Sequence, residues 1–171
     1  LIKPMLIPPR NWSKLEDGGY FLNDLTRCYE MVRRGHVLTQ GETPIAFLNT
    51  IQQVKYKVNP FIVNVAKELE ERKITVGKFR PVIDHVIPPK PADIATNDEA
   101  RKAWKVEART ARNNQANEIR KSCRTRMTMN VVREFEGKDF YIPWSFDYRG
   151  RTYPIPAFLT PQCTDFGKSL L

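Results

Sequence analysis

The chain has 171 residues, of which 41% are hydrophobic, enough for a domain with a substantial core. No apolar run approaches the ~20 residues that a membrane-spanning helix needs, and the three cysteines and two histidines are too scattered to indicate a disulfide framework or a zinc site. The formal net charge is +9; between Arg101 and Arg133 there are ten basic and two acidic residues, so this stretch carries +8 and the rest of the chain +1. Such a concentration is typical of a surface that faces phosphates.

Residues 1–42 are predicted to form an irregular but packed segment. Prolines at positions 4, 8 and 9 and the pair Gly18-Gly19 prevent long regular elements. Apolar residues such as Trp12 and Tyr20 are expected to anchor this segment to a core.

Residues 43–136 are predicted to be helical. Thr43-Pro44 is a suitable helix start, and apolar residues then recur at helical spacing through Val54 and Val58 to Leu69. Because a proline inside a helix costs ~3 kcal/mol, Asn59-Pro60 predicts two helices joined at a bend, with Asn59 as the cap of the second, which ends near Lys73.

A third helix is expected after a proline-rich connection over residues 74–96. Thr96 or Asn97 would cap it, and Gly137 would end it near Glu136. Its expected apolar stripe is Trp104, Ala108, Ala111, Ile119, Cys123, Met127 and Val131. A basic ridge is expected beside that stripe at Arg101, Lys105, Arg109, Arg112, Arg120 and Arg124.

The last segment, residues 137–171, changes character. Two β-prone runs, 140–142 and 144–146, are separated by Pro143, and residues 147–153 read as a turn between short strands. The predicted fold class is therefore mainly α, with long helices and a small β-containing C-terminal segment. Because the chain does not start with methionine and stops directly after an apolar run, we expect it to be a piece of a longer protein.

The basic ridge has two interpretations. It could be a solvated helix face, but such faces normally mix charges of both signs to gain i,i+4 pairs. Ten like charges on one helix instead favour a polyanion partner, and their spacing suits contacts to a sugar-phosphate backbone without base recognition.

The heptapeptide at 147–153 also has two interpretations. Arg149 and Arg151 flank Gly150, so a sharp turn could present two guanidinium groups to phosphate or sugar oxygens, while Tyr148 and Tyr153 offer planar faces for a base. The alternative is a purely structural Asp-Arg salt bridge in a tight turn.

Asp-Tyr-Arg-Gly-Arg-Thr-Tyr at 147–153, Leu-Thr-Pro-Gln at 159–162 and Asp-Phe-Gly-Lys-Ser-Leu-Leu at 165–171 resemble the DxRGRxY…NPQGxDxxKxLL signature of single-subunit RNA polymerases from phages, mitochondria and chloroplasts. Weaker similarities precede it in the same order, at residues 4–20, 55–59 and 120–122. Two positions depart from the family pattern: Cys163 stands where a glycine is usual, and Cys123 where an arginine is common.

The resemblance implies a domain organisation and an activity. Residues 1–42 would end the N-terminal region, 43–136 would form the thumb, and 137–171 would begin the palm. The complete protein would be a nucleotidyltransferase, a DNA-directed RNA polymerase whose partners are the DNA template, the nascent RNA and ribonucleoside triphosphates, and it is expected to be a monomer without a membrane anchor. Its magnesium ions would be held by aspartates C-terminal to the matched motifs, so this chain is expected to hold no metal, to contain no catalytic residue and to be inactive alone.

The resemblance also implies roles for individual residues. Those implied to hold the template and the RNA–DNA hybrid are Arg120, Lys121 and Arg124. Those implied to contact template, RNA or substrate are Asp147, Tyr148, Arg149, Gly150, Arg151, Tyr153 and Lys168. Within that set, Arg151 is the strongest candidate for the sugar or phosphate of nascent RNA or substrate, and Tyr148 for a position near the template base.

Two other functions fit the residues themselves. The chain could be a stand-alone basic helical module that binds nucleic acid without enzymatic activity, or a structural helical protein whose basic ridge docks an acidic partner. The polymerase interpretation places the protein in the host cytoplasm if it is viral and in a mitochondrion or chloroplast if it is organellar; the compact spacing of the motifs favours a viral origin.

Overall fold

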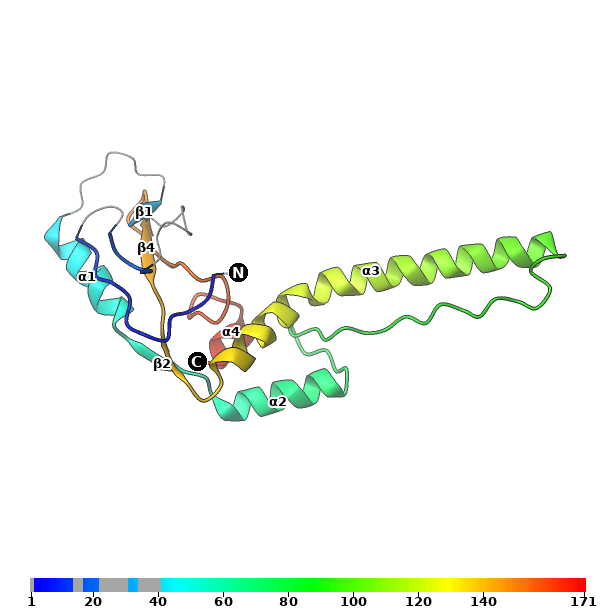
Figure 1. The fold of residues 1–171 in the computed structure, drawn as a ribbon, viewed down its shortest axis with the longest axis horizontal. Helices are drawn as coiled ribbons and strands as arrows, with labels where there is room; N and C mark the ends of the chain where they lie inside the picture. Colours follow the sequence, from blue (N-terminus) through cyan, green and yellow to red (C-terminus); the bar gives the residue numbers. More distant parts are fainter. Residues whose placement is uncertain (1, 14–16, 22–30, 34–40) are drawn as a thin grey trace. The chain divides into compact units, whose positions relative to one another are not determined.

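The computed structural model describes residues 2–13, 17–21, 31–33 and 41–171 (Figure 1). Its elements are, in chain order, β1 (Val32–Arg33), α1 (Glu42–Gln52), β2 (Lys55–Lys57), α2 (Pro60–Glu71), α3 (Asp98–Phe135), β3 (Asp139–Tyr141), β4 (Trp144–Asp147), β5 (Thr152–Pro154) and α4 (Asp165–Ser169). The predicted class, mainly α with a small β-containing C-terminal segment, is confirmed. Within the described residues, no helix is both long and apolar enough to cross a membrane.

The chain divides into two compact units. The first unit combines Leu1–Val65 with Thr128–Leu171, and the second is Ala66–Met127. Helix α3 therefore begins in the second unit and ends in the first.

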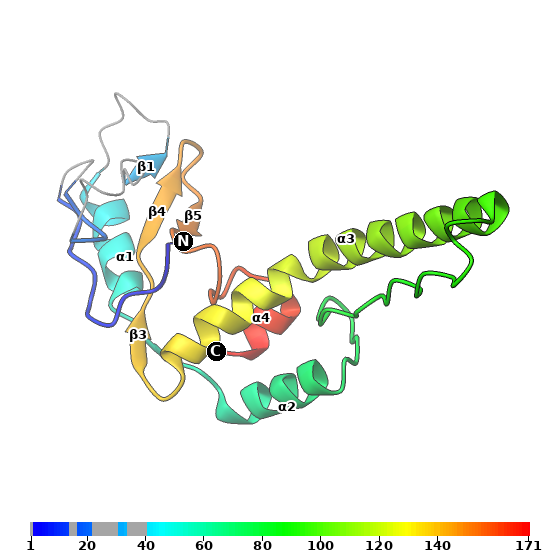
Figure 2. The same cartoon turned by 45° about the vertical axis from the view of Figure 1, so that its right-hand side comes forward.

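Two small sheets organise the first unit. Strand β4 lies between β1, to which it is parallel, and β5, to which it is antiparallel (Figure 2). Phe146 is in register with Val32 on one side and with Thr152 on the other. Strands β2 and β3 form a separate antiparallel pair. The strands and turn predicted between Phe140 and Tyr153 are confirmed.

The core of the first unit joins residues that are distant in sequence. Its largest fully buried side chains include Trp12, Leu48, Phe140 and Ile142. The indole Nε1 of Trp12 donates to the backbone oxygen of Trp144 at 3.1 Å. A Cβ at Gly18 would lie 2.3 Å from the Trp12 ring, so only glycine allows the chain to pass this closely. The described N-terminal residues are thus fixed to the sheet.

The predicted helical run through Val54 and Val58 is wrong. Helix α1 has Gly41 as its N-cap in place of the expected Thr43, so it begins two residues earlier than expected, and it ends at Gln52. The next residues form β2, which pairs with the distant β3, so a long-range ladder overrides the local helical period. The expected cap of α2 is confirmed, because Oδ1 of Asn59 accepts from the N–H of Phe61 at 3.1 Å.

The long helix α3 has the predicted limits. Oδ1 of Asn97 accepts from the N–H groups of Glu99 and Ala100, at 3.0 and 3.1 Å. Gly137, with φ of 76°, follows the last turn in the left-handed conformation that commonly ends a helix.

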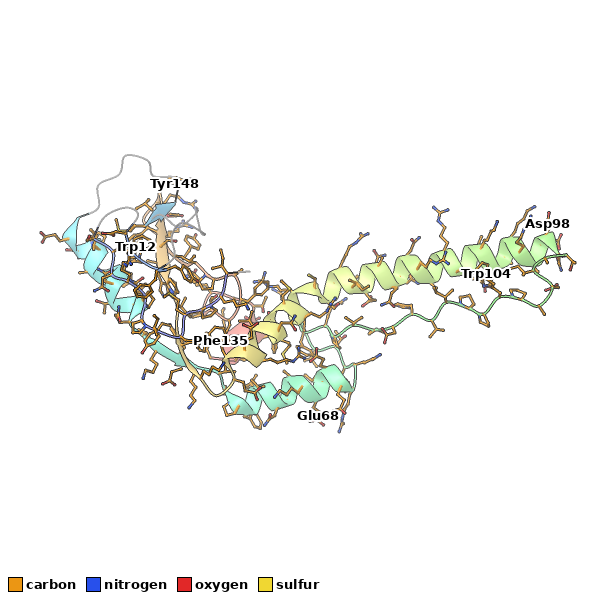
Figure 3. All side chains as sticks on the ribbon, in the orientation of Figure 1. Trp12, Glu68, Asp98, Trp104, Phe135 and Tyr148 are labelled. Atoms are coloured by element: carbon orange, nitrogen blue, oxygen red, sulfur yellow. The ribbon has the colours of Figure 1, made fainter. Side chains whose placement is uncertain are left out.

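Within the second unit, the proline-rich connection runs along α3 in the opposite direction. Three side chains of α3 hold it: Oγ1 of Thr125 accepts from Arg80 N (3.0 Å), Oε1 of Gln115 accepts from His85 N (2.6 Å), and Nε1 of Trp104 donates to Pro88 O (2.9 Å). Figure 3 shows Trp104 on the side of α3 that faces this connection.

These contacts correct the predicted apolar stripe of α3. Ile119 is 43% exposed and Cys123 is exposed, whereas Ser122 and Thr125 are buried. An extended connection leaves backbone N–H groups that need acceptors, so α3 turns polar side chains toward it where the hydrophobic pattern predicted apolar ones. Ala108 is buried as expected.

Candidate nucleic-acid interface

The heptapeptide forms a tight hairpin between β4 and β5. The N–H of Gly150 donates to the carbonyl of Asp147 at 3.0 Å, and the N–H of Asp147 donates to the carbonyl of Arg151 at 2.8 Å. Gly150 has φ of 78°. This is a three-residue loop in which glycine occupies the left-handed position that closes the turn.

The carboxylate of Asp147 holds the turn from inside. Its Oδ1 accepts from the N–H groups of Arg149 and Arg151, both at 2.9 Å, and its Oδ2 pairs with the Arg149 guanidinium at 3.0 Å. Partial burial raises the pKa of Asp147, but the hydrogen bonds from Arg151 and Arg149 together with the Arg149 charge outweigh it and lower the pKa overall. The structural salt bridge considered above therefore exists, and it uses Arg149.

Tyr148 lies at the exposed tip of the hairpin (Figure 3). Its side chain is 63% exposed, and the Arg149 guanidinium carbon stands 5.2 Å from the ring centroid. The salt bridge thus also places a cation over one face of the ring. A planar, solvent-facing aromatic group remains at the tip.

Arg151 differs from Arg149 in what its side chain does. Its backbone N–H is bound to Asp147, but its side chain is exposed and has no carboxylate within ion-pair distance among the described residues. It lines an open cavity of about 790 Å³ in the first unit. The cavity is lined by Thr43, Pro44, Phe47, Phe146, Gly150, Arg151, Thr152, Tyr153 and Gln162.

The structure brings together most of the predicted hairpin residues but not Lys168. Tyr153, on β5, is partly buried and lines the same cavity as Arg151. Lys168 lies in the last turn of α4, 3.8 Å from Asp165, and is not among the cavity-lining residues.

Six of the nine described lining residues were not predicted as site residues: Thr43, Pro44, Phe47, Phe146, Thr152 and Gln162. Gln162, whose Nε2 donates to the carbonyl of Thr152 at 2.9 Å, belongs to the Pro-Gln motif and could have been chosen on that ground. Phe47 does not lie on the buried face of α1, which is formed by Leu48 and Gln52. An aromatic residue outside the buried face of a helix could have indicated a binding residue.

The basic residues of α3 are all on the surface. All ten between positions 101 and 133 are exposed. Arg120 has no ion pair among the described residues, Lys121 lies 3.4 Å from Glu118, and Arg124 is exposed but takes part in an interaction. These three residues belong to the second unit, whereas the hairpin belongs to the first. The ridge is accessible to a polyanion.

The described residues do not fit a magnesium site. None of them forms a group of three or more His, Cys, Asp or Glu side chains able to hold a metal ion. Asp147 is committed to the hairpin, and the Asp165 side chain is 95% exposed beside Lys168. Cys28 and His36 lie outside the described residues.

Comparison with known proteins gives a consistent set of relatives, although no protein-family model matches the chain. The chain is 31% identical over 179 residues to the DNA-directed RNA polymerase of Enterobacteria phage K11, covering 99% of this chain and 19% of the relative. It is 28% identical to T7 RNA polymerase of Escherichia phage T7, covering 100% of the chain and 20% of the relative. It is also 28% identical to DNA-directed RNA polymerase 2, chloroplastic/mitochondrial, of Arabidopsis thaliana, covering 98% and 17%. The chain thus spans about a fifth of these relatives, and the resemblance expected from its motifs is confirmed.

Proposed function

We propose that this chain, which is homologous over nearly its whole length to a segment of the single-subunit DNA-directed RNA polymerases of phages and organelles, is part of such a polymerase and holds nucleic acid beside its catalytic centre. The observation that carries the proposal is the geometry of Arg151. In a hairpin closed by Asp147 and Gly150, its backbone is fixed while its guanidinium lacks a carboxylate partner among the described residues and lines an open cavity. A guanidinium presented in this way is suited to a phosphate or sugar oxygen.

The other hairpin residues have supporting roles. Asp147 and Gly150 shape the turn, Arg149 fixes the Tyr148 ring from one side, and Tyr148 offers its exposed surface to a template base. Tyr153 extends the cavity wall next to Arg151. Lys168, in the motif at residues 165–171, is proposed to contact nucleic acid.

The exposed basic residues of α3 are proposed to contact the backbone of the template and the RNA–DNA hybrid. Arg120 is the best placed of the three predicted residues, because Lys121 and Arg124 already interact with other groups. In this proposal residues 1–42, 43–136 and 137–171 are the end of the N-terminal region, the thumb and the start of the palm.

The complete protein is proposed to be a monomer that copies a DNA template into RNA from ribonucleoside triphosphates. Its magnesium ions would be held by carboxylates outside the described residues. Its relatives include phage and organellar enzymes, so it acts in the host cytoplasm if viral, the origin that the compact motif spacing favours, and in a mitochondrion or chloroplast if organellar.

The test is Arg151→Ala in the complete polymerase. We expect the elongation rate to fall about 10- to 100-fold, the equivalent of losing one charged hydrogen bond of roughly 1.5–3 kcal/mol, while promoter binding changes less than about twofold. Arg72→Ala is the matched control, because this arginine is exposed and already paired with Glu68 at 2.7 Å. Equal losses of elongation and promoter binding would contradict the proposal that Arg151 contacts the growing end of the RNA.

A further inference from the structure

The cavity beside Arg151 has two kinds of wall. Residues 150–153 of the hairpin form one part, and Thr43, Pro44 and Phe47 of α1 form another. Among the described residues that line it, Arg151 is the only charged one, and it gives this part of the cavity a positive electrostatic character. Its volume, about 790 Å³, lies within the roughly 300–1,000 Å³ typical of sites for small ligands.

Phe47 contributes an apolar face to this cavity. Helix α1 buries Leu48 and Gln52, whereas the Phe47 side chain is 51% exposed. The ring is therefore not part of the core of the first unit. It is held on a regular helix of 11 residues, so its position is fixed by the backbone and not by a loop.

We propose that Phe47 is a base-stacking residue, and that the cavity takes one unpaired nucleotide with its phosphate on Arg151 and its base against the Phe47 ring. This inference rests on the proposed function of Arg151 and adds the α1 wall to the same site. A phosphate accounts for a guanidinium that has no carboxylate partner in the described part of the chain, and a base accounts for the exposed ring. Phenylalanine has no hydrogen-bonding group, so the stacking would be independent of base identity, as suits a protein in which base pairing reads the sequence.

Other exposed aromatic residues do not share this setting. The Phe21 ring lies 5.3 Å from the Arg10 guanidinium carbon, and Arg149 lies over one face of the exposed Tyr148 ring; neither aromatic residue is among the described lining residues of the cavity. Phe61, on α2, is 70% exposed and is not a lining residue of the cavity. Among the described aromatic residues exposed in this way, Phe47 alone lines the cavity with Arg151.

The experiment measures binding of short single-stranded RNA and DNA oligonucleotides carrying 2-aminopurine to the full-length protein. Phe47→Leu keeps an apolar side chain but removes the ring, Phe47→Tyr restores the ring, and Phe61→Leu makes the same change outside the cavity. We expect Phe47→Leu to weaken binding about 10-fold and to relieve the quenching of 2-aminopurine, because base stacking is worth roughly 1–3 kcal/mol. Phe47→Tyr should bind within about twofold of the unchanged protein, and Phe61→Leu should have no effect.

The outcomes separate this inference from the proposed function. If Phe47→Leu binds normally while Arg151→Gln binds weakly, stacking is refuted and the phosphate contact stands. If neither change weakens binding, both proposals fail. Equal weakening by Phe61→Leu and Phe47→Leu would also overturn the stacking site. A loss confined to RNA assigns the nucleotide to the transcript, and a loss confined to DNA assigns it to the template; either result supports the site.

Discussion

The carboxylate of Asp147 makes different contacts with the two arginines of the hairpin. It binds the guanidinium and N–H of Arg149 but only the N–H of Arg151. Arg149 is therefore part of the hairpin's structure, whereas the Arg151 side chain has no carboxylate partner among the described residues. Removing Asp147 would disturb both, so substitution of this residue cannot separate folding from binding.

Gly150 provides a cleaner test of the hairpin. Its φ is 78°, and an added Cβ would meet no atom within 4 Å, so the cost of a side chain is purely conformational. We expect Gly150→Ala to lower the free energy of unfolding by about 1–2 kcal/mol, measured by urea denaturation. Gly150→Asn should cost less, because asparagine tolerates the left-handed conformation. If alanine were as stable as glycine, the turn would not need this conformation.

The sequence predicted the hairpin residues of the candidate site but not the pairing of Asp147 or the position of Phe47, and the reason is physical. The 147–153 motif predicted the turn and its residues, because a glycine between two arginines after an aspartate is informative locally. It could not decide which arginine pairs with Asp147, since that depends on the hydrogen-bond geometry of the closed hairpin. Phe47 was missed because its neighbours in the cavity come from strands about 100 residues later in the chain.

At the scale of elements, local rules predicted helix ends better than they predicted strands. The cap Asn59 was identified correctly, and Asn97 was one of the two caps expected for α3, because a cap depends on the next three residues only. The strand Lys55–Lys57 was assigned to a helix, because its partner, Asp139–Tyr141, is far away in sequence. The polar side of α3 was misjudged for the same reason: its partner is an extended connection and not a second apolar helix face.

The connection along α3 makes a prediction about stability. Thr125 is 4% exposed, and its Oγ1 accepts from the N–H of Arg80 at 3.0 Å. Thr125→Val keeps the shape but leaves this N–H without an acceptor, so we expect the second unit to lose about 1–3 kcal/mol of stability. Hydrogen exchange of the Arg80 amide and urea unfolding would measure the change.

Thr110→Val is the control for this prediction. Thr110 is exposed on the same helix, and its Oγ1 donates only to the carbonyl of Val106 in its own helix, at 2.9 Å. Its replacement should change stability by less than about 0.5 kcal/mol. If the two valine variants were equally stable, the polar contacts would not hold the connection to α3.

At the scale of the whole molecule, the dominant feature is charge. The net charge is +9, and residues 101–133 of α3, whose ten basic side chains are all exposed, carry +8 of it. Outside this stretch, several of the described cations are paired with acids, as Arg72 is with Glu68 and Lys73 with Asp84. A phosphate backbone bound at unpaired cations would release counterions, so affinity should fall steeply as salt increases.

The salt dependence of duplex binding can locate the responsible cations. Arg112 and Arg120 are exposed, and neither has a carboxylate partner among the described residues. In the double variant Arg112→Gln, Arg120→Gln we expect the slope of log K against log salt to become shallower by about 1.8, or about 0.9 for each lost phosphate contact.

The control is Arg72→Gln with Lys73→Gln, which removes the same net charge from residues that are paired with acids. Its slope should change much less, because these two side chains are held by carboxylates. Equal changes in the two double variants would mean that net charge alone attracts nucleic acid, and that the basic face of α3 makes no specific contact with phosphates.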